Sequence, residues 1–149
     1  MSGSVYYSYL LEAKNEFTAS LLHLEFSYHS VAGFSERSDG LSESDLEKVE
    51  AFTSRFARVV DLLVHRILRA IDRFELNEPG TLIDVANRAE SRELVKSVDW
   101  LRELKDIRNR IAHDYAGAQL MDLLKFCSES FAELRLACER TVAYIDQLA

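Results

Sequence analysis

The chain has 149 residues, 48% of them apolar and 29% charged, with a formal net charge of −7. This length and balance predict one globular domain over residues 1–149 and exclude a disordered chain. No apolar run reaches the roughly 18–20 residues of a membrane-spanning helix, and the first residues do not resemble a signal peptide. Cys127 and Cys138, the only cysteines, are expected to be small apolar packing residues in a reducing cytoplasm. Taken alone, the acidic charge disfavours a nucleic-acid partner.

The one proline and five glycines all lie near breaks in the apolar pattern, which predicts long helices joined by short loops. The first helix is expected over about residues 5–33, where apolar side chains recur at spacings of three and four. This stripe consists of Leu10, Ala13, Phe17, Leu21, Leu24, Tyr28 and Val31.

A polar loop should separate the first helix from the second, and Ser44 with Glu47 fits a capping box at the start of the second. Apolar spacing then continues to about Glu75, followed by a turn cluster over residues 77–80. The second apolar stripe consists of Val49, Phe52, Phe56, Val59, Val60, Leu63, Ile67, Ile71 and Phe74.

Two further long helices and one short helix complete the predicted fold. Thr81 with Asp84 resembles the start of a short helix that continues to about residue 90. One long pattern begins at Leu94 and ends near Gly117, and the last runs from Leu120 to about residue 145. Because no alternating strand pattern occurs, we expect an all-α bundle of four long helices and one short helix.

The charge is unevenly divided along the chain. Residues 51–73 carry +3, from five arginines against two aspartates, and residues 88–113 carry +2, from seven basic against five acidic side chains. The other segments are all acidic. Most such basic stretches are solvated helix faces, yet a basic cleft can lie within an acidic protein, so the net charge does not exclude an RNA substrate.

Residues 106–115 are the one group with evident chemistry. At roughly 100° per residue, Asn109 and His113 share a helix face, with Asp106 just before them, while Arg108 and Tyr115 share a neighbouring stripe. Arginine neutralises phosphoryl oxygens and histidine exchanges protons near neutral pH, so the group suits phosphate chemistry. The alternative is a helix end at which Arg108 and His113 only cap carbonyls or pair with acids.

Written as Arg108-Asn109-x-x-x-His113-x-Tyr115, this string resembles the R-x4-H-x-Y signature of HEPN-domain proteins. More narrowly it is similar to the HepT branch, the toxin half of the HepT/MntA toxin–antitoxin pairs. The segments over residues 55–58, 61–63 and 100–104 also look like that family, and the resemblance covers about residues 5–145.

The resemblance implies a HEPN-like bundle and a metal-independent endoribonuclease without a cofactor. It also implies a homodimer in which two motif helices face each other across a cleft. By position, Arg108 is expected to stabilise the charge on the pentavalent phosphorus and His113 to act as general acid or base. In the reaction that the resemblance implies, the ribose 2′-hydroxyl attacks the adjacent phosphorus and a 2′,3′-cyclic phosphate forms. Asn109 is expected to position the motif or the substrate.

In the HepT branch, the motif tyrosine receives AMP from the MntA-like nucleotidyltransferase antitoxin of a type VII-like system, which points here to Tyr115. A bulky anion beside Arg108 would occupy the phosphate site and repel RNA. Two alternatives stay open: a non-catalytic helical subunit that binds a nucleotidyltransferase, and a purely structural helical dimer.

The remaining polar and aromatic residues have simpler interpretations. His23 and His29 are expected to be ordinary polar or interface residues. Asp61, His65 and Arg69 form an i, i+4, i+8 line that either flanks the cleft or is a surface charge ladder. Tyr6, Tyr7 and Tyr9 could stack on bases, although packing against a helix or protomer is favoured. Leu11 and Leu22 lie off the main stripe and point to oligomerisation.

Overall fold

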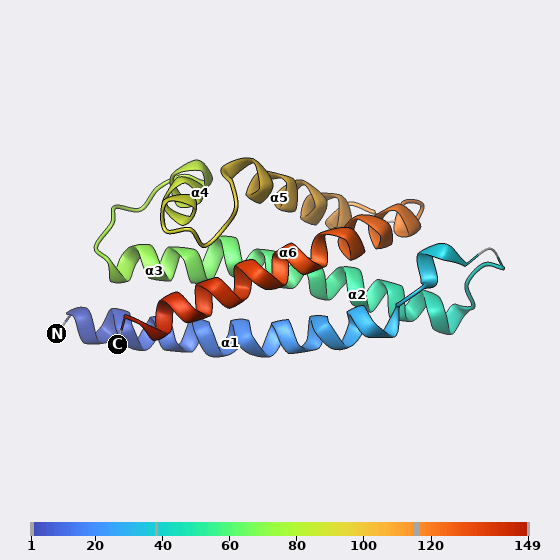
Figure 1. Ribbon diagram of the computed structural model, residues 1–149, viewed down its shortest axis with the longest axis horizontal. Coiled ribbons are helices and arrows are strands. Elements are labelled where there is room, and N and C mark those ends of the chain that lie inside the picture. Colours follow the sequence, from blue (N-terminus) through green and yellow to red (C-terminus); the bar gives the residue numbers. More distant parts are fainter. Residues whose placement is uncertain (1, 38, 115–116, 149) are drawn as a thin grey trace.

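The computed structural model describes residues 2–37, 39–114 and 117–148, and none of these residues lies in a strand (Figure 1). The elements are α1 (Ser2–Ser30), η1 (Phe34–Glu36), α2 (Glu43–Asp61), η2 (Leu62–Ile67), α3 (Leu68–Phe74), α4 (Leu82–Ser91), α5 (Val98–Ala112) and α6 (Leu120–Asp146). The consecutive elements α2, η2 and α3 form one long helical run. The predicted all-α bundle of four long helices and one short helix is therefore confirmed.

Capping boxes start two of the helices. At α4 the box is the predicted one: Asp84 N donates to Thr81 Oγ1 at 3.3 Å, and Thr81 N donates to Asp84 Oδ2 at 2.9 Å. The Asp84 carboxylate accepts from both the backbone N–H and the hydroxyl of Thr81, and these two bonds lower the pKa of Asp84. At α2 the prediction of Ser44 with Glu47 is wrong, because Ser42 and Asp45 make the reciprocal bonds two residues earlier.

Two predicted helix boundaries also differ from the structure. The fourth pattern was expected to begin at Leu94, but α5 begins at Val98, capped by Ser97. Leu94 and Val95 lie in the preceding loop and are nevertheless buried, so they continue the apolar pattern without being helical. The helix ends at Ala112 rather than near Gly117.

The long central run contains a π-helical stretch, η2, over Leu62–Ile67. A π-helical turn inserts an extra residue and so displaces the faces on either side of it, and such turns are frequent at functional sites. Here the inward side chains remain apolar throughout, because Leu63, Val64 and Ile67 are all buried. His65, on the same turn, is exposed to solvent.

Each long helix runs antiparallel to the next long helix along the chain, and together they enclose one apolar core (Figure 1). The central run lies between α1 on one side and α4 with α5 on the other, and α6 crosses over α1 and α2. Three phenylalanines at the centre, Phe17, Phe52 and Phe56, are fully buried, and Tyr28 stacks on Phe131 with ring centroids 4.0 Å apart. Among the described residues, no helix is long and apolar enough to span a membrane.

Replacing Thr81 with alanine is expected to lower the free energy of unfolding by about 1 kcal/mol, because the N-terminal amides of α4 lose their hydroxyl acceptor. Chemical denaturation measures this change. The matched control is Thr18→Ala, since Thr18 is an exposed threonine inside α1 whose hydroxyl donates to Lys14 O. That control should shift the same quantity by less than about 0.5 kcal/mol. Equal effects would contradict the capping role.

Candidate functional site

The motif arginine is held by an ion pair from the neighbouring helix. Arg108 Nε donates to Asp61 Oδ1 at 2.8 Å, with the two side chains 34% and 38% exposed. Asp61 is the last residue of α2, which packs against α5. The sequence pattern placed Asp61 in a line with His65 and Arg69, and it gave no sign of this contact across 47 residues. Arg108 thus pairs with an acid, as the structural alternative expected.

The other motif residues lie near Arg108 or at the end of α5. Asn109 is half-buried, and its Oδ1 accepts from Arg108 Nη1 at 3.5 Å. His113 is the exposed C-cap residue, and its backbone N–H donates to Asn109 O at 3.1 Å. The i, i+4 relation of Asn109 and His113 is therefore kept in the backbone. The prediction that Arg108 and Tyr115 share one helical stripe requires a helix that continues past residue 112, but α5 ends at Ala112. Tyr115 itself lies outside the described residues.

A polar turn follows the motif helix. Asp114 Oδ1 accepts from the backbone N–H of Gln119 at 3.2 Å. Gln119 Oε1 in turn accepts from Arg110 at 3.1 and 3.3 Å, and the Arg110 guanidinium lies 4.8 Å from the ring centroid of Phe126. These contacts tie the last turn of α5 to the start of α6.

His65 lies in the same electrostatic neighbourhood as the motif arginine. Partial burial of its imidazole, together with the Lys105 cation, lowers its pKa below the usual range. Arg69 and Arg108 act in the same direction, whereas the Asp61 carboxylate opposes them. The charges of Lys105 and Arg108 on α5 therefore act on the His65 imidazole of η2. Of the three residues in the Asp61 line, Asp61 pairs with Arg108 and Arg69 donates to Gly80 O, so both bond to residues outside the line.

Replacing Asp61 with asparagine is expected to lower the pKa of His65 further, because the carboxylate is the opposing charge. Titration of the His65 ring protons by nuclear magnetic resonance measures this. A histidine whose pKa is depressed by folding binds fewer protons folded than unfolded, so its contribution destabilises the fold as the pH falls through the unfolded value of about 6.5. That acid sensitivity should therefore increase in the variant. A raised His65 pKa would contradict this geometry.

The other residues considered in the sequence analysis include two histidines and the two cysteines. His23 and His29 are both exposed on α1, and the His29 ring packs against Tyr28 at 5.5 Å between centroids. Both cysteines are buried, as predicted, and burial raises the pKa of each thiol. Within the described part of the chain, no group of three or more His, Cys, Asp or Glu side chains is placed to hold a metal ion.

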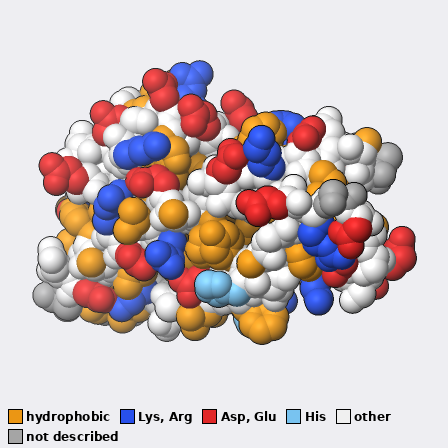
Figure 2. Space-filling model, turned by 45° about the vertical axis from the view of Figure 1, so that its right-hand side comes forward, with side chains coloured by type: hydrophobic (Ala, Val, Ile, Leu, Met, Phe, Trp, Pro, Cys, Tyr) orange, Lys and Arg blue, Asp and Glu red, His pale blue; other side chains and the backbone are white. Residues whose placement is uncertain are grey.

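The surface charge is mixed rather than uniform. Figure 2 shows acidic and basic side chains interspersed over one face, with apolar side chains gathered near its centre beside a histidine. On this face a polyanion would therefore meet no continuous basic surface. Comparison with protein-family models, with curated proteins and with solved structures finds no match for this chain.

Proposed function

We propose that this protein is a cytoplasmic, metal-independent endoribonuclease of the HepT kind, with Arg108, Asn109 and His113 in its active site. The observation that supports this most is the position of Arg108. It lies five residues before His113 at the end of α5, is fixed by Asp61, and its charge acts together with that of Lys105 on the His65 imidazole. An anchored arginine and an exposed histidine on one helix end are the two kinds of side chain that phosphodiester transfer needs.

In the proposed reaction His113 takes the proton of a ribose 2′-hydroxyl or protonates the leaving 5′-oxygen. The 2′-oxygen forms a bond to phosphorus and the bond from phosphorus to the 5′-oxygen breaks. The products are a 2′,3′-cyclic phosphate and a 5′-hydroxyl, so no water is consumed in this step.

Arg108 would stabilise the additional negative charge on the phosphoryl oxygens. Its Nε is engaged by Asp61 at 2.8 Å, which orients the guanidinium plane and leaves the terminal nitrogens for substrate. Asn109 Oδ1 lies 3.5 Å from one of these nitrogens and can guide its direction. Because Asp61 also lowers the net charge at the site, its role here is to position Arg108 rather than to attract RNA.

We propose further that the active form is a homodimer with the two motif helices facing each other. Exposed apolar side chains beside the motif support this: Met121 and Phe126 at the start of α6 are 42% and 38% exposed, and Arg110 contacts Phe126. Leu22 and Phe26 on α1, at 62% and 70%, offer a second apolar surface. A dimer would bring two Arg108 side chains to one cleft.

The regulatory part of the proposal is AMP attachment to Tyr115 by an MntA-like nucleotidyltransferase. It is tested by mass spectrometry after incubation of the chain with that partner and ATP. The proposal requires one added adenylyl group on the peptide that contains Tyr115, absent in Tyr115→Phe. A modified Tyr115→Phe chain would overturn this assignment.

Regulated expression in a bacterial host tests the toxin function in cells. The parent chain should arrest growth, and His113→Ala at equal abundance should not. Arrest by both chains would contradict the nuclease assignment.

One observation favours the non-catalytic alternative. The Arg108 guanidinium already has a carboxylate partner, so the motif could serve only to hold the bundle or an anion. Under this alternative the chain forms a tight complex with a nucleotidyltransferase and leaves RNA intact. An unchanged RNA ladder together with a stoichiometric complex would support it.

A further inference from the structure

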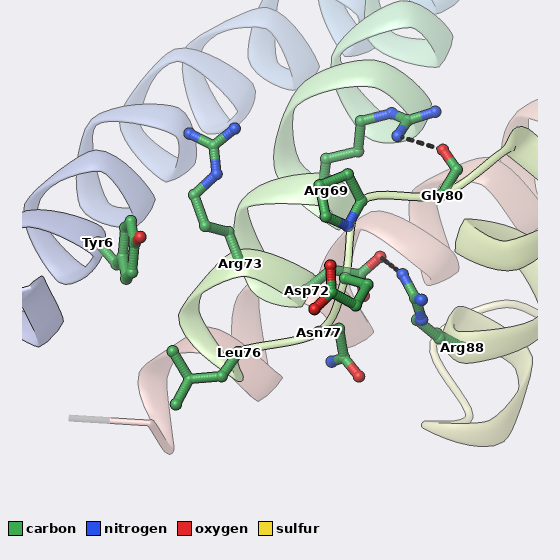
Figure 3. Close-up of a pocket in the computed structure, with 10 residues that line it drawn as sticks. Tyr6, Arg69, Asp72, Arg73, Leu76, Asn77, Gly80 and Arg88 are labelled. Carbon is green, nitrogen blue, oxygen red and sulfur yellow. Dashed lines mark hydrogen bonds and ion pairs between the residues drawn. The ribbon is translucent and has the colours of Figure 1, made fainter.

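A pocket of about 300 Å³ opens where α1 begins and α3 ends (Figure 3). This is the opposite end of the bundle from the end of α5 (Figure 1). Its size is at the lower limit of pockets that hold small ligands. The lining comes from α1, from α3, from the turn before α4 and from α4 itself. These residues are Tyr6, Arg69, Asp72, Arg73, Leu76, Asn77, Glu78, Pro79, Gly80 and Arg88.

Asp72, the buried acid of this pocket, is already paired with two arginines of the protein. Asp72 is 5% exposed, and its two carboxylate oxygens accept from Arg88 at 3.1 Å and from Arg92 at 2.6 Å. Arg92 also pairs with Glu75 at 2.8 Å. With Asp72 compensated inside the protein, the pocket offers an incoming ligand positive rather than negative charge.

Two arginines of α3 supply that charge. Arg69 Nη1 donates to Gly80 O at 2.9 Å, which fixes the turn that closes the pocket. Gly80 is required there, since a Cβ would come within 2.6 Å of Asp84 Oδ2. Arg73 forms no ion pair with any residue that the structure describes, and its guanidinium only faces the ring of Tyr9 at 5.4 Å.

An aromatic ring and apolar side chains complete the lining. Of the three tyrosines at the start of α1, Tyr7 packs on Phe74 at 5.8 Å between centroids, and Tyr9 lies under Arg66 and Arg73. Tyr6 instead borders the pocket, across from Arg69 and Gly80 (Figure 3). A tyrosine ring beside a cation suits a ligand with a flat ring and an anionic group.

We propose that this pocket binds a nucleoside phosphate, with the phosphate on Arg73 and Arg69 and the base against Tyr6. The ligand is either a free nucleotide or one unit of an RNA chain, and the same contacts recognise both. Glu78, on the exposed turn, is the one lining carboxylate without an arginine partner among the described residues, and it opposes the phosphate. The pocket is separate from Arg108 and His113, so binding here does not depend on RNA cleavage.

Calorimetric titration with two probes tests the proposal: AMP, and a 2′-O-methylated RNA hexamer that cannot be cleaved through its 2′-oxygen. Replacing Arg73 with alanine should weaken binding of at least one probe about tenfold. Tyr6→Ala should weaken it to a similar extent, and Glu78→Gln should strengthen it. The matched control is Arg135→Ala, which removes an exposed arginine from α6.

Loss of AMP binding in Arg73→Ala identifies a free nucleotide as the ligand, and loss of hexamer binding alone identifies an RNA unit. Both results support the pocket. The proposal is overturned if neither probe binds the parent chain, or if Arg73→Ala binds as the Arg135→Ala control does. Glu78 lies on an exposed turn, so Glu78→Gln is not expected to disturb folding. This variant must also bind the probe more tightly than the parent chain does, and an unchanged affinity for the probe overturns the proposal.

Discussion

Replacing His113 with alanine is expected to slow RNA cleavage by about 10²–10⁴-fold, the range that general acid–base catalysis contributes. The imidazole is exposed at the end of α5, where a substrate can reach it, and it lies five residues beyond the anchored Arg108. Cleavage of a labelled RNA by the purified variant, compared with the parent at equal concentration, measures this effect.

The matched control for His113 is His23→Ala. His23 is an exposed histidine on α1, away from the motif helix. This variant should cleave RNA at the parental rate, since no step of the proposed reaction involves His23. Equal losses in the two variants would show that the effect is not specific to the motif, and undiminished cleavage by His113→Ala would remove its catalytic assignment.

Replacing Asp72 with alanine should lower the free energy of unfolding by about 3 kcal/mol, since breaking a buried ion pair leaves its partner uncompensated. Asp72 joins α3 to α4 through Arg88, and it joins the end of α4 through Arg92. Arg92 is only 12% exposed and would keep Glu75 alone as its partner. Urea denaturation followed by circular dichroism measures the change.

A second aspartate provides the comparison. Asp146 pairs with Lys14 at the surface, with its side chain 56% exposed. Solvent screening makes such pairs weak, so Asp146→Ala should cost less than about 1 kcal/mol. If both variants lose the same stability, burial is not what makes the Asp72 pair important.

The apolar spacing predicted the number and order of the helices because nearly every inward position carries a bulky apolar side chain. Thr81 with Asp84 also located the start of α4. At α2 the sequence pattern pointed to Ser44 with Glu47, whereas the box is formed by Ser42 with Asp45, so the predicted start was two residues too late. The loop residues Leu94 and Val95 imitate helical spacing because a buried loop needs apolar side chains as well.

Residue spacing could not predict features that depend on contacts between segments far apart in the sequence. The spacing of α5 placed Asn109 and His113 on one helix face, but it could not show that Arg108 meets Asp61. The π-helical turn is equally hidden, because its buried residues keep the spacing of an ordinary helix. Nor could residue spacing separate Tyr6, which lines a pocket, from Tyr7 and Tyr9, which pack against neighbouring side chains.

The net charge of −7 first argued against a nucleic-acid partner. Within a surface of mixed charge, the structure nevertheless holds small groups of basic side chains. Lys105 and Arg108 lie together beside η2, and Arg69 and Arg73 lie together on α3. For a phosphate ligand the local field matters more than the total.

The chemical identity of the RNA ends left after cleavage in EDTA tests the central claim most directly. The proposed reaction predicts that the purified chain leaves 2′,3′-cyclic phosphates and 5′-hydroxyls without a divalent ion. An RNA that stays intact in EDTA, or fragments that carry 3′-hydroxyls and 5′-phosphates, would contradict it.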